Sequence, residues 1–166
     1  PHHLGGALEE DTFSAGGFFW GDVAAYARIQ LATVPSLLPD RAAVRASVVE
    51  AARDTLDRQA TQPFATPYVP DDGLYEWGSN SAVLNNQALL VAGFDLTGDP
   101  AFGHGVLAGM DYLLGRNALN NSYVTDYGTV FSKNQHSRWY AAQIDPGLPH
   151  PPPGTVSGGP NSDVPD

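Results

Sequence analysis

A short polar loop, Asp95–Asp99 (DLTGD), separates two apolar segments that both follow the periodicity of an α-helix. The apolar positions before the loop are Val83, Leu84, Ala88, Val91 and Phe94. Those after it are Phe102, Val106, Leu107, Met110 and Leu114. Ser79 or Ser81 can cap the first helix, and Asp99 with Pro100 predicts the start of the second. Gly115 suits a left-handed C-cap, so the sequence predicts an αα-hairpin here.

Two further helices are predicted upstream of the hairpin. The first spans Phe18–Thr33 despite Gly21 and ends before Pro35. The positions at helical spacing are Phe19, Val23, Tyr26 or Ala27, and Ile29–Gln30. The second begins at the N-cap Asp40, and its apolar positions are Val44, Val48, Ala52 and Leu56. Its other side carries four arginines, which we interpret as a solvated face: Arg41, Arg45, Arg53 and Arg58.

The remaining segments have no regular pattern. Residues 1–17 are Gly-rich and acidic and are predicted to form a loop, and the Pro-rich residues 61–78 cannot form a regular element. That second segment holds four aromatic residues that either anchor it or face a ligand, with anchoring favoured by the pattern alone: Phe64, Tyr68, Tyr75 and Trp77. The tail Ile144–Asp166 is predicted to be extended or disordered. With no strand pattern of useful length, the fold class is all-α.

Charge and composition exclude several functions. The chain has 18 acidic and 8 basic residues, a net charge of −10, which disfavours nucleic acids and anionic membranes as partners. It contains no cysteine and no apolar run near the ~18 residues that span a membrane. The N-terminus has no signal-peptide pattern, and Pro1 in place of methionine predicts that the chain begins inside a longer one. No motif predicts a zinc or other metal site.

The stretch Asp111–Arg138 contains the best candidate site, because an apolar helix leads there into a polar loop rich in Tyr and Asn. His136 and Arg138 lie two residues apart, so in extended backbone both would point to one side and donate hydrogen bonds to hydroxyl or anionic groups. Aromatic residues combined with such donors suit a carbohydrate. The alternative is that both side chains are merely solvated.

Four blocks resemble, in order and spacing, the C-terminal part of glycoside hydrolase family 9: WGSNSAVLNNQALLVAGFDLTGDPAF, MDYLLGRNALNNSYVTDYG, KNQHSR and SGGPNSD. The resemblance covers residues 75–163 best. It implies a fragment of an (α/α)6 barrel with long irregular loops, residues 1–166 forming part of one catalytic domain. Family members are mostly endo-β-1,4-glucanases, so the expected function of the parent protein is hydrolysis of β-1,4-glucosidic bonds in cellulose or related β-glucans.

The same resemblance assigns residue roles. His136 and Arg138 match family positions that bind glucose hydroxyls, and Trp77 matches a tryptophan that stacks on a sugar ring. Gln135 stands where the family usually has proline. The expected partner is therefore a β-glucan polysaccharide or oligosaccharide, and an extracellular location is expected for a secreted parent. No cofactor is required, although family members often bind structural calcium, for which no ligands can be assigned.

The family's catalytic pair is expected to lie outside this chain. Family 9 enzymes invert the anomeric centre with an aspartate base in a DAGD-like motif and a glutamate acid that follows the Gly-Gly-Pro-Asn segment. No DAGD occurs here, and Asp166 ends the sequence before that glutamate. We therefore expect the isolated chain to be inactive. Because a piece of a closed helical ring leaves apolar faces uncovered, we also expect marginal stability or self-association. The alternative functions are a non-catalytic carbohydrate-binding helical protein and a helical protein without a sugar ligand.

Overall fold

The computed structural model describes residues 12–13, 18–19, 21–70 and 72–162. Within them lie four helices: α2 Ala24–Thr33, α3 Arg41–Ala60, α4 Ser79–Thr97 and α5 Pro100–Leu113. These described residues contain no strand, only three isolated β-bridges, so the predicted all-α class is confirmed. Most of the predicted N-terminal loop, including the acidic cluster Glu9–Asp11, lies outside the described residues.

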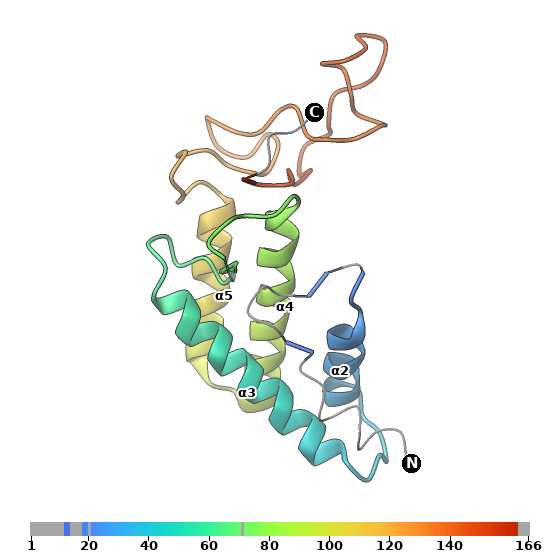
Figure 1. Cartoon of the computed structure of the whole chain (residues 1–166), viewed down its shortest axis with the longest axis vertical. Helices are drawn as coiled ribbons and strands as arrows, with labels where there is room; N and C mark the ends of the chain where they lie inside the picture. The colour runs from blue at the N-terminus through green and yellow to red at the C-terminus, as the bar shows by residue number, and fades with distance from the viewer. Residues whose placement is uncertain (1–11, 14–17, 20, 71, 163–166) are drawn as a thin grey trace.

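The helices lie side by side, and the long irregular segments gather beyond one end of them (Figure 1). Helices α3 and α4 each pack against all three other helices of the described structure. The main core is formed by side chains from all four helices, including Ala25, Val48, Leu90 and Phe102. Because α4 and α5 are antiparallel, the first residue of α4 and the last residue of α5 lie at the same end, next to the irregular segments.

The α4–α5 hairpin is confirmed, but its connection is shorter than predicted. Helix α4 continues to Thr97, so only Gly98 and Asp99 join the two helices. Gly98 adopts φ +71°, a left-handed conformation that glycine reaches without steric cost. Asp99 caps α5 as predicted, since its Oδ1 accepts a hydrogen bond of 3.0 Å from the Ala101 amide.

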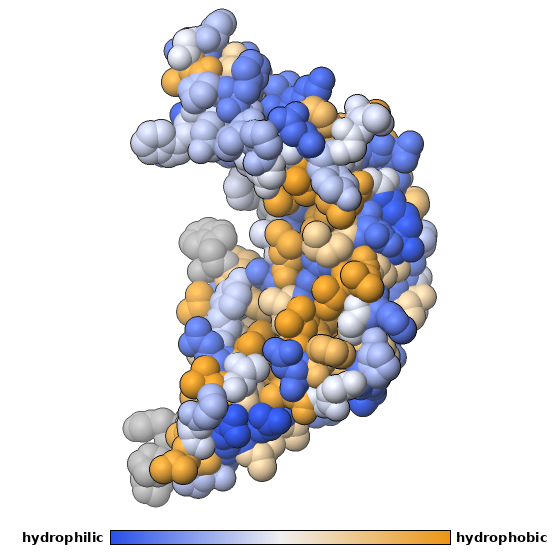
Figure 2. Space-filling model, turned by 180° about the vertical axis from the view of Figure 1, so that it is seen from behind, coloured by the Kyte–Doolittle hydropathy of each residue, from blue (hydrophilic) through white to orange (hydrophobic). Residues whose placement is uncertain are grey.

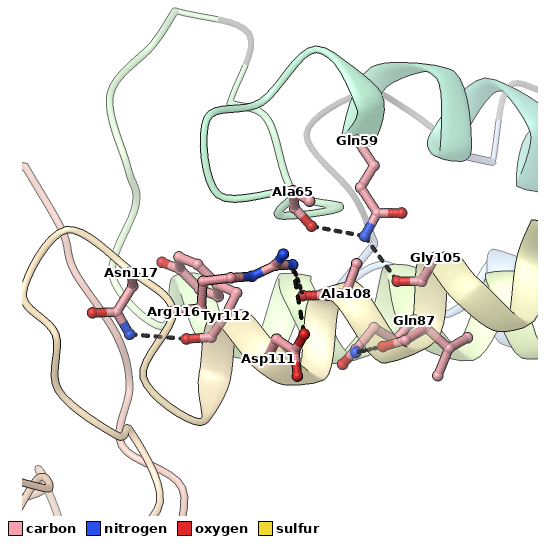
Figure 3. A network of polar contacts seen from close by, with 10 residues as sticks. Gln59, Ala65, Gln87, Gly105, Ala108, Asp111, Tyr112, Arg116 and Asn117 are labelled. Carbon is pink, nitrogen blue, oxygen red and sulfur yellow. Dashed lines mark hydrogen bonds and ion pairs between the residues drawn. The ribbon is translucent and has the colours of Figure 1, made fainter.

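Buried glutamines, which the sequence reading missed, fix α3 and α4 against α5 (Figure 3). Gln59 Nε2 donates to the carbonyls of Ala65 (2.7 Å) and Gly105 (2.9 Å). Gln87 Nε2 donates to the Val106 carbonyl at 2.9 Å. A Cβ atom on Gly105 would lie 2.8 Å from Gln59 Oε1, so the absence of a side chain at that position permits the close approach.

The first predicted helix begins later than expected. Helix α2 starts at Ala24, not Phe18, because the chain turns at Gly21 and the Asp22 amide donates to the Phe19 carbonyl at 2.9 Å. The predicted apolar positions are only partly right, since Tyr26 and Ile29 pack against the core but Phe19 and Val23 are exposed. The buried positions of α2 are instead Ala25, Arg28 and Ala32.

Helix α3 matches its predicted core positions, but its arginines are not simply a solvated face. Arg41 and Arg45 donate to the Ala32 carbonyl at 3.3 and 3.2 Å, which satisfies a C-terminal carbonyl of α2. Arg53 pairs with Asp99 at 3.4 Å. Asp40 occupies the N-cap position of α3, although its side chain accepts no capping hydrogen bond.

The face of α4 was also assigned wrongly. The apolar side chains of α4 that are buried in the described structure are Val83, Leu89, Leu90 and Ala92. Of the five predicted positions only Val83 is buried, whereas Ala88, Leu84 (37%), Val91 (43%) and Phe94 (43%) are exposed. Figure 2 shows hydrophobic residues gathered along the middle of one face of the molecule.

Candidate functional site

The start of α4 is bound to the C-terminal segment 157–160. The Asn80 amide donates to the Gly158 carbonyl at 3.0 Å, and Asn80 Nδ2 donates to the Ser157 carbonyl at 3.0 Å. Ser79 Oγ donates to the Pro160 carbonyl at 2.6 Å, so Ser79 does not cap α4 as predicted. The N-cap residue is Gly78, with φ +80°, and Ser81 does not cap the helix either.

The same C-terminal segment is also bound to residues 122–125. The Ser157 amide donates to the Tyr123 carbonyl at 2.8 Å, and the Thr125 amide donates to the Thr155 carbonyl at 2.9 Å. Tyr123 is in turn joined to the end of α5, because its amide donates to the Leu113 carbonyl at 2.8 Å. The tail is irregular, as predicted, but residues 154–162 are held by these bonds rather than left disordered.

These contacts bring Trp77 and His136 together at the end of the helices. Their rings meet edge to face, with centroids 5.5 Å apart and an interplanar angle of 88°. Trp77 is 62% exposed and His136 is exposed, so both rings are open to a ligand. Arg138 is exposed two residues further on, and among the described residues it forms no ion pair.

The aromatic residues of the 61–78 segment therefore divide into anchors and an open ring. Tyr68 is 2% exposed and packs edge to face against Tyr75, with ring centroids 5.6 Å apart. Trp77, in contrast, keeps most of its surface exposed. Anchoring was the interpretation favoured by the pattern alone, and it applies to the two tyrosines but not to Trp77.

A pocket of about 360 Å³, which neither Trp77 nor His136 lines, is bordered by three tyrosines, Tyr75, Tyr112 and Tyr123, together with Phe64 and Pro160. Burial raises the pKa of all three tyrosine hydroxyls above the usual value, because the charged phenolate is poorly solvated there. They consequently remain protonated at neutral pH. The lining of this pocket is thus aromatic, with neutral hydroxyl groups.

Residues 12–13, 18–19, 21–70 and 72–162 contain no group of three or more His, Cys, Asp or Glu residues that could hold a metal ion. The expectation of structural calcium therefore stays untested. No helix among these residues is long and apolar enough to cross a membrane.

Comparison with known proteins gives consistent matches over nearly the whole chain. Residues 3–165 match the model of glycosyl hydrolase family 9. Endoglucanase C of Cellulomonas fimi is 56% identical over 152 residues, which cover 92% of this chain and 14% of that protein. A cellulose 1,4-β-cellobiosidase of Acetivibrio thermocellus is 38% identical over 176 residues, covering 98% of this chain and 20% of that protein. The chain thus spans a fifth or less of the length of either relative.

Solved structures show the same likeness. The family 9 endoglucanase J30 superposes with a TM-score of 0.78 at 25% identity, over 96% of this chain and 28% of that one. AaCel9A, solved in complex with cellobiose-like isofagomine, superposes with a TM-score of 0.74 at 29% identity, over 93% of this chain and 29% of that one.

Proposed function

The chain belongs to glycosyl hydrolase family 9, and we propose that the natural protein containing it hydrolyses β-1,4-glucosidic bonds in cellulose or related β-glucans. Family 9 enzymes have an (α/α)6 barrel, and the four helices found in the described residues form part of such a barrel. Within that protein, this chain supplies one edge of the substrate cleft. The observation that carries the proposal is the open ring contact between Trp77 and His136.

The chemistry of that pair fits a glucan. A pyranose ring offers an apolar C–H face that stacks on an indole, and its rim of hydroxyls accepts hydrogen bonds. Trp77 provides the indole, while His136 and the Arg138 guanidinium provide donors within two residues of each other. AaCel9A, a structural neighbour, was solved in complex with a cellobiose-like isofagomine, and this supports a sugar ligand for the natural protein.

The acid and base of the reaction belong, in this proposal, to residues outside the chain. Inverting hydrolysis requires two carboxyl groups on opposite sides of the scissile bond, roughly 6.5–9.5 Å apart. The DAGD motif expected to supply the base does not occur in the sequence. Two carboxyl groups and a water molecule complete the reaction, so no cofactor is required. Because polymeric cellulose cannot enter a cell, we propose an extracellular location.

Replacing Trp77 by alanine tests the binding role directly. In the natural protein, Trp77→Ala is expected to weaken cellotetraose binding, measured by calorimetry, by ~30-fold, or about 2 kcal/mol, as for an aromatic hot spot. The fold should tolerate the change because Trp77 is 62% exposed. Phe94→Ala is the matched control, since Phe94 is a partly exposed aromatic residue in the last turn of α4. Equal affinities for Trp77→Ala and wild type would contradict the proposed site.

The exposed face of α4 leads to a second expectation. We propose that the isolated 166-residue chain self-associates through Leu84 and Val91, because exposed apolar patches favour association. The double variant Leu84→Glu/Val91→Glu should lower the weight-average mass in sedimentation equilibrium. Ala42→Glu/Ala43→Glu, on the exposed start of α3, is the control and should leave the mass unchanged. A wild-type chain that stays monomeric at every concentration would refute the proposal.

A further inference from the structure

We propose that Gln135 is a positioning residue: its buried side-chain amide holds the His136 loop against Trp77 and thereby sets the affinity for glucan. The inference rests on the proposed function, because it concerns the same Trp77–His136 pair. Gln135 is 5% exposed, whereas the adjacent Asn134 and His136 are both exposed. A buried polar side chain between two exposed neighbours marks the point at which the loop is attached to the structure below it.

The Gln135 side-chain amide contacts three different segments of the chain. Its Nε2 donates to Thr125 Oγ1, and the carbonyls of Thr155 and Ser132 lie at 3.3 and 3.4 Å as further acceptors. Thr125 belongs to the segment that follows α5, Ser132 to the loop itself, and Thr155 to the C-terminal tail. One side chain therefore joins the loop carrying His136 to two segments distant from it in sequence.

The directions of the hydrogen bonds show that Gln135 holds the loop as a donor, through its Nε2 atom. Thr125 Oγ1 donates to the Ser132 carbonyl at 3.1 Å, so its own hydrogen is engaged and it accepts from Gln135. The Gln135 Oε1 atom, by contrast, has no hydrogen-bond partner among the described residues. A glutamate at this position has the same shape, but as a carboxylate it cannot donate and would face carbonyl oxygens.

Both members of the ring pair are thus attached to the same tail. The Trp77 side is attached through Asn80, which bonds the carbonyls of Ser157 and Gly158. The His136 side is attached through Gln135, which reaches the Thr155 carbonyl. Adjacent Cα atoms are only ~3.8 Å apart, so a shift of Gln135 moves His136 with it. Loss of the Gln135 donor should therefore separate the two rings.

The test is fluorine NMR of the natural protein labelled with 5-fluorotryptophan, in which Trp77→Phe assigns the Trp77 line. His136→Ala gives the chemical shift of Trp77 without its ring partner. Gln135→Glu is expected to move the Trp77 line toward that value. Gln143→Glu makes the same chemical change at an exposed glutamine, and it should leave the line where wild type has it. Should Gln135→Glu fail to fold, the near-isosteric Thr125→Val removes the same acceptor and must produce the same displacement.

The second readout separates positioning from general damage. Gln135→Glu should raise KM for cellotetraose roughly tenfold, the size expected for a lost buried hydrogen bond, with kcat changed less than twofold. An unmoved Trp77 line together with an unchanged KM in Gln135→Glu would overturn the inference. If wild type itself binds no cello-oligosaccharide, the proposed function fails, while the fluorine line still decides whether Gln135 positions His136.

Discussion

The 166-residue chain by itself is expected to leave carboxymethyl cellulose intact, while the natural protein that contains it cleaves the polymer. General acid–base catalysis contributes ~10²–10⁴-fold for each group, so a chain without the acid and the base should lose at least ~10⁴-fold. The chain retains Trp77, His136 and Arg138, and it should therefore still bind cello-oligosaccharides if it is kept folded. Reducing-sugar release and calorimetric titration on the same preparation measure both properties.

Glu76 is the carboxylate that could most directly contradict this expectation, because it immediately precedes Trp77 and is exposed. Glu76→Gln in the natural protein is expected to change kcat less than about threefold, since a group outside the reacting pair supplies little of the ~10²–10⁴-fold effect. Asp111→Asn, on the exposed side of α5, is the matched control. Turnover by the 166-residue chain that survives repeated purification and disappears in Glu76→Gln would refute the assignment.

Local signals were sufficient for the parts of the fold that depend on neighbouring residues. The α4–α5 hairpin was predictable because its second helix starts with a strong local signal: Asp99 is the N-cap residue, and Pro100 is the first helical residue. The beginning of α2 was not predictable in this way. There, the residues after Phe18 have helical spacing, which predicts a helix. Gly21 instead permits a turn, so the helix begins later.

The inward face of α4 could not be predicted from hydrophobicity, because some of its polar residues are buried and some of its apolar residues are exposed. Asn86 and Gln87 are buried because they donate to the backbone carbonyls of Pro67 and Val106, so they behave as packing residues. Leu84 and Val91 are exposed on another side of the same helix. In an (α/α)6 barrel each helix contacts neighbours on more than one side, and a single apolar stripe is then a poor guide to burial.

The candidate site required contacts between segments distant in sequence. His136 and Arg138 could be selected from their spacing, and Trp77 from the family resemblance. The contact between Trp77 and His136, however, depends on the tail, which the sequence predicted to be extended or disordered. Tail residues accept hydrogen bonds mainly through backbone carbonyls, as at Ser157 and Gly158, and backbone carbonyls leave no pattern in the sequence.

Phe102 is expected to be the side chain whose truncation costs the described core most. It is fully buried on α5, and the Arg53 guanidinium lies 5.4 Å from its ring centroid. A Cβ atom on Gly93 would lie only 3.1 Å from the Phe102 ring, so the α4 backbone is already in close contact with it. Backbone cannot readily collapse into the cavity that Phe102→Ala would leave. The expected loss in the free energy of unfolding is therefore about 3–5 kcal/mol.

Urea unfolding of the 166-residue chain, in which Phe94 is exposed, measures this loss by tryptophan fluorescence. Phe94→Ala removes the same ring from a position that is 43% exposed at the end of α4, and it should cost less than about 1.5 kcal/mol. The contrast between the two variants matters more than either value, because both delete one phenyl group from the same hairpin. Equal losses would mean that Phe102 is no better packed than a surface residue. The arrangement of α3, α4 and α5 that supports the Trp77–His136 pair would then be wrong.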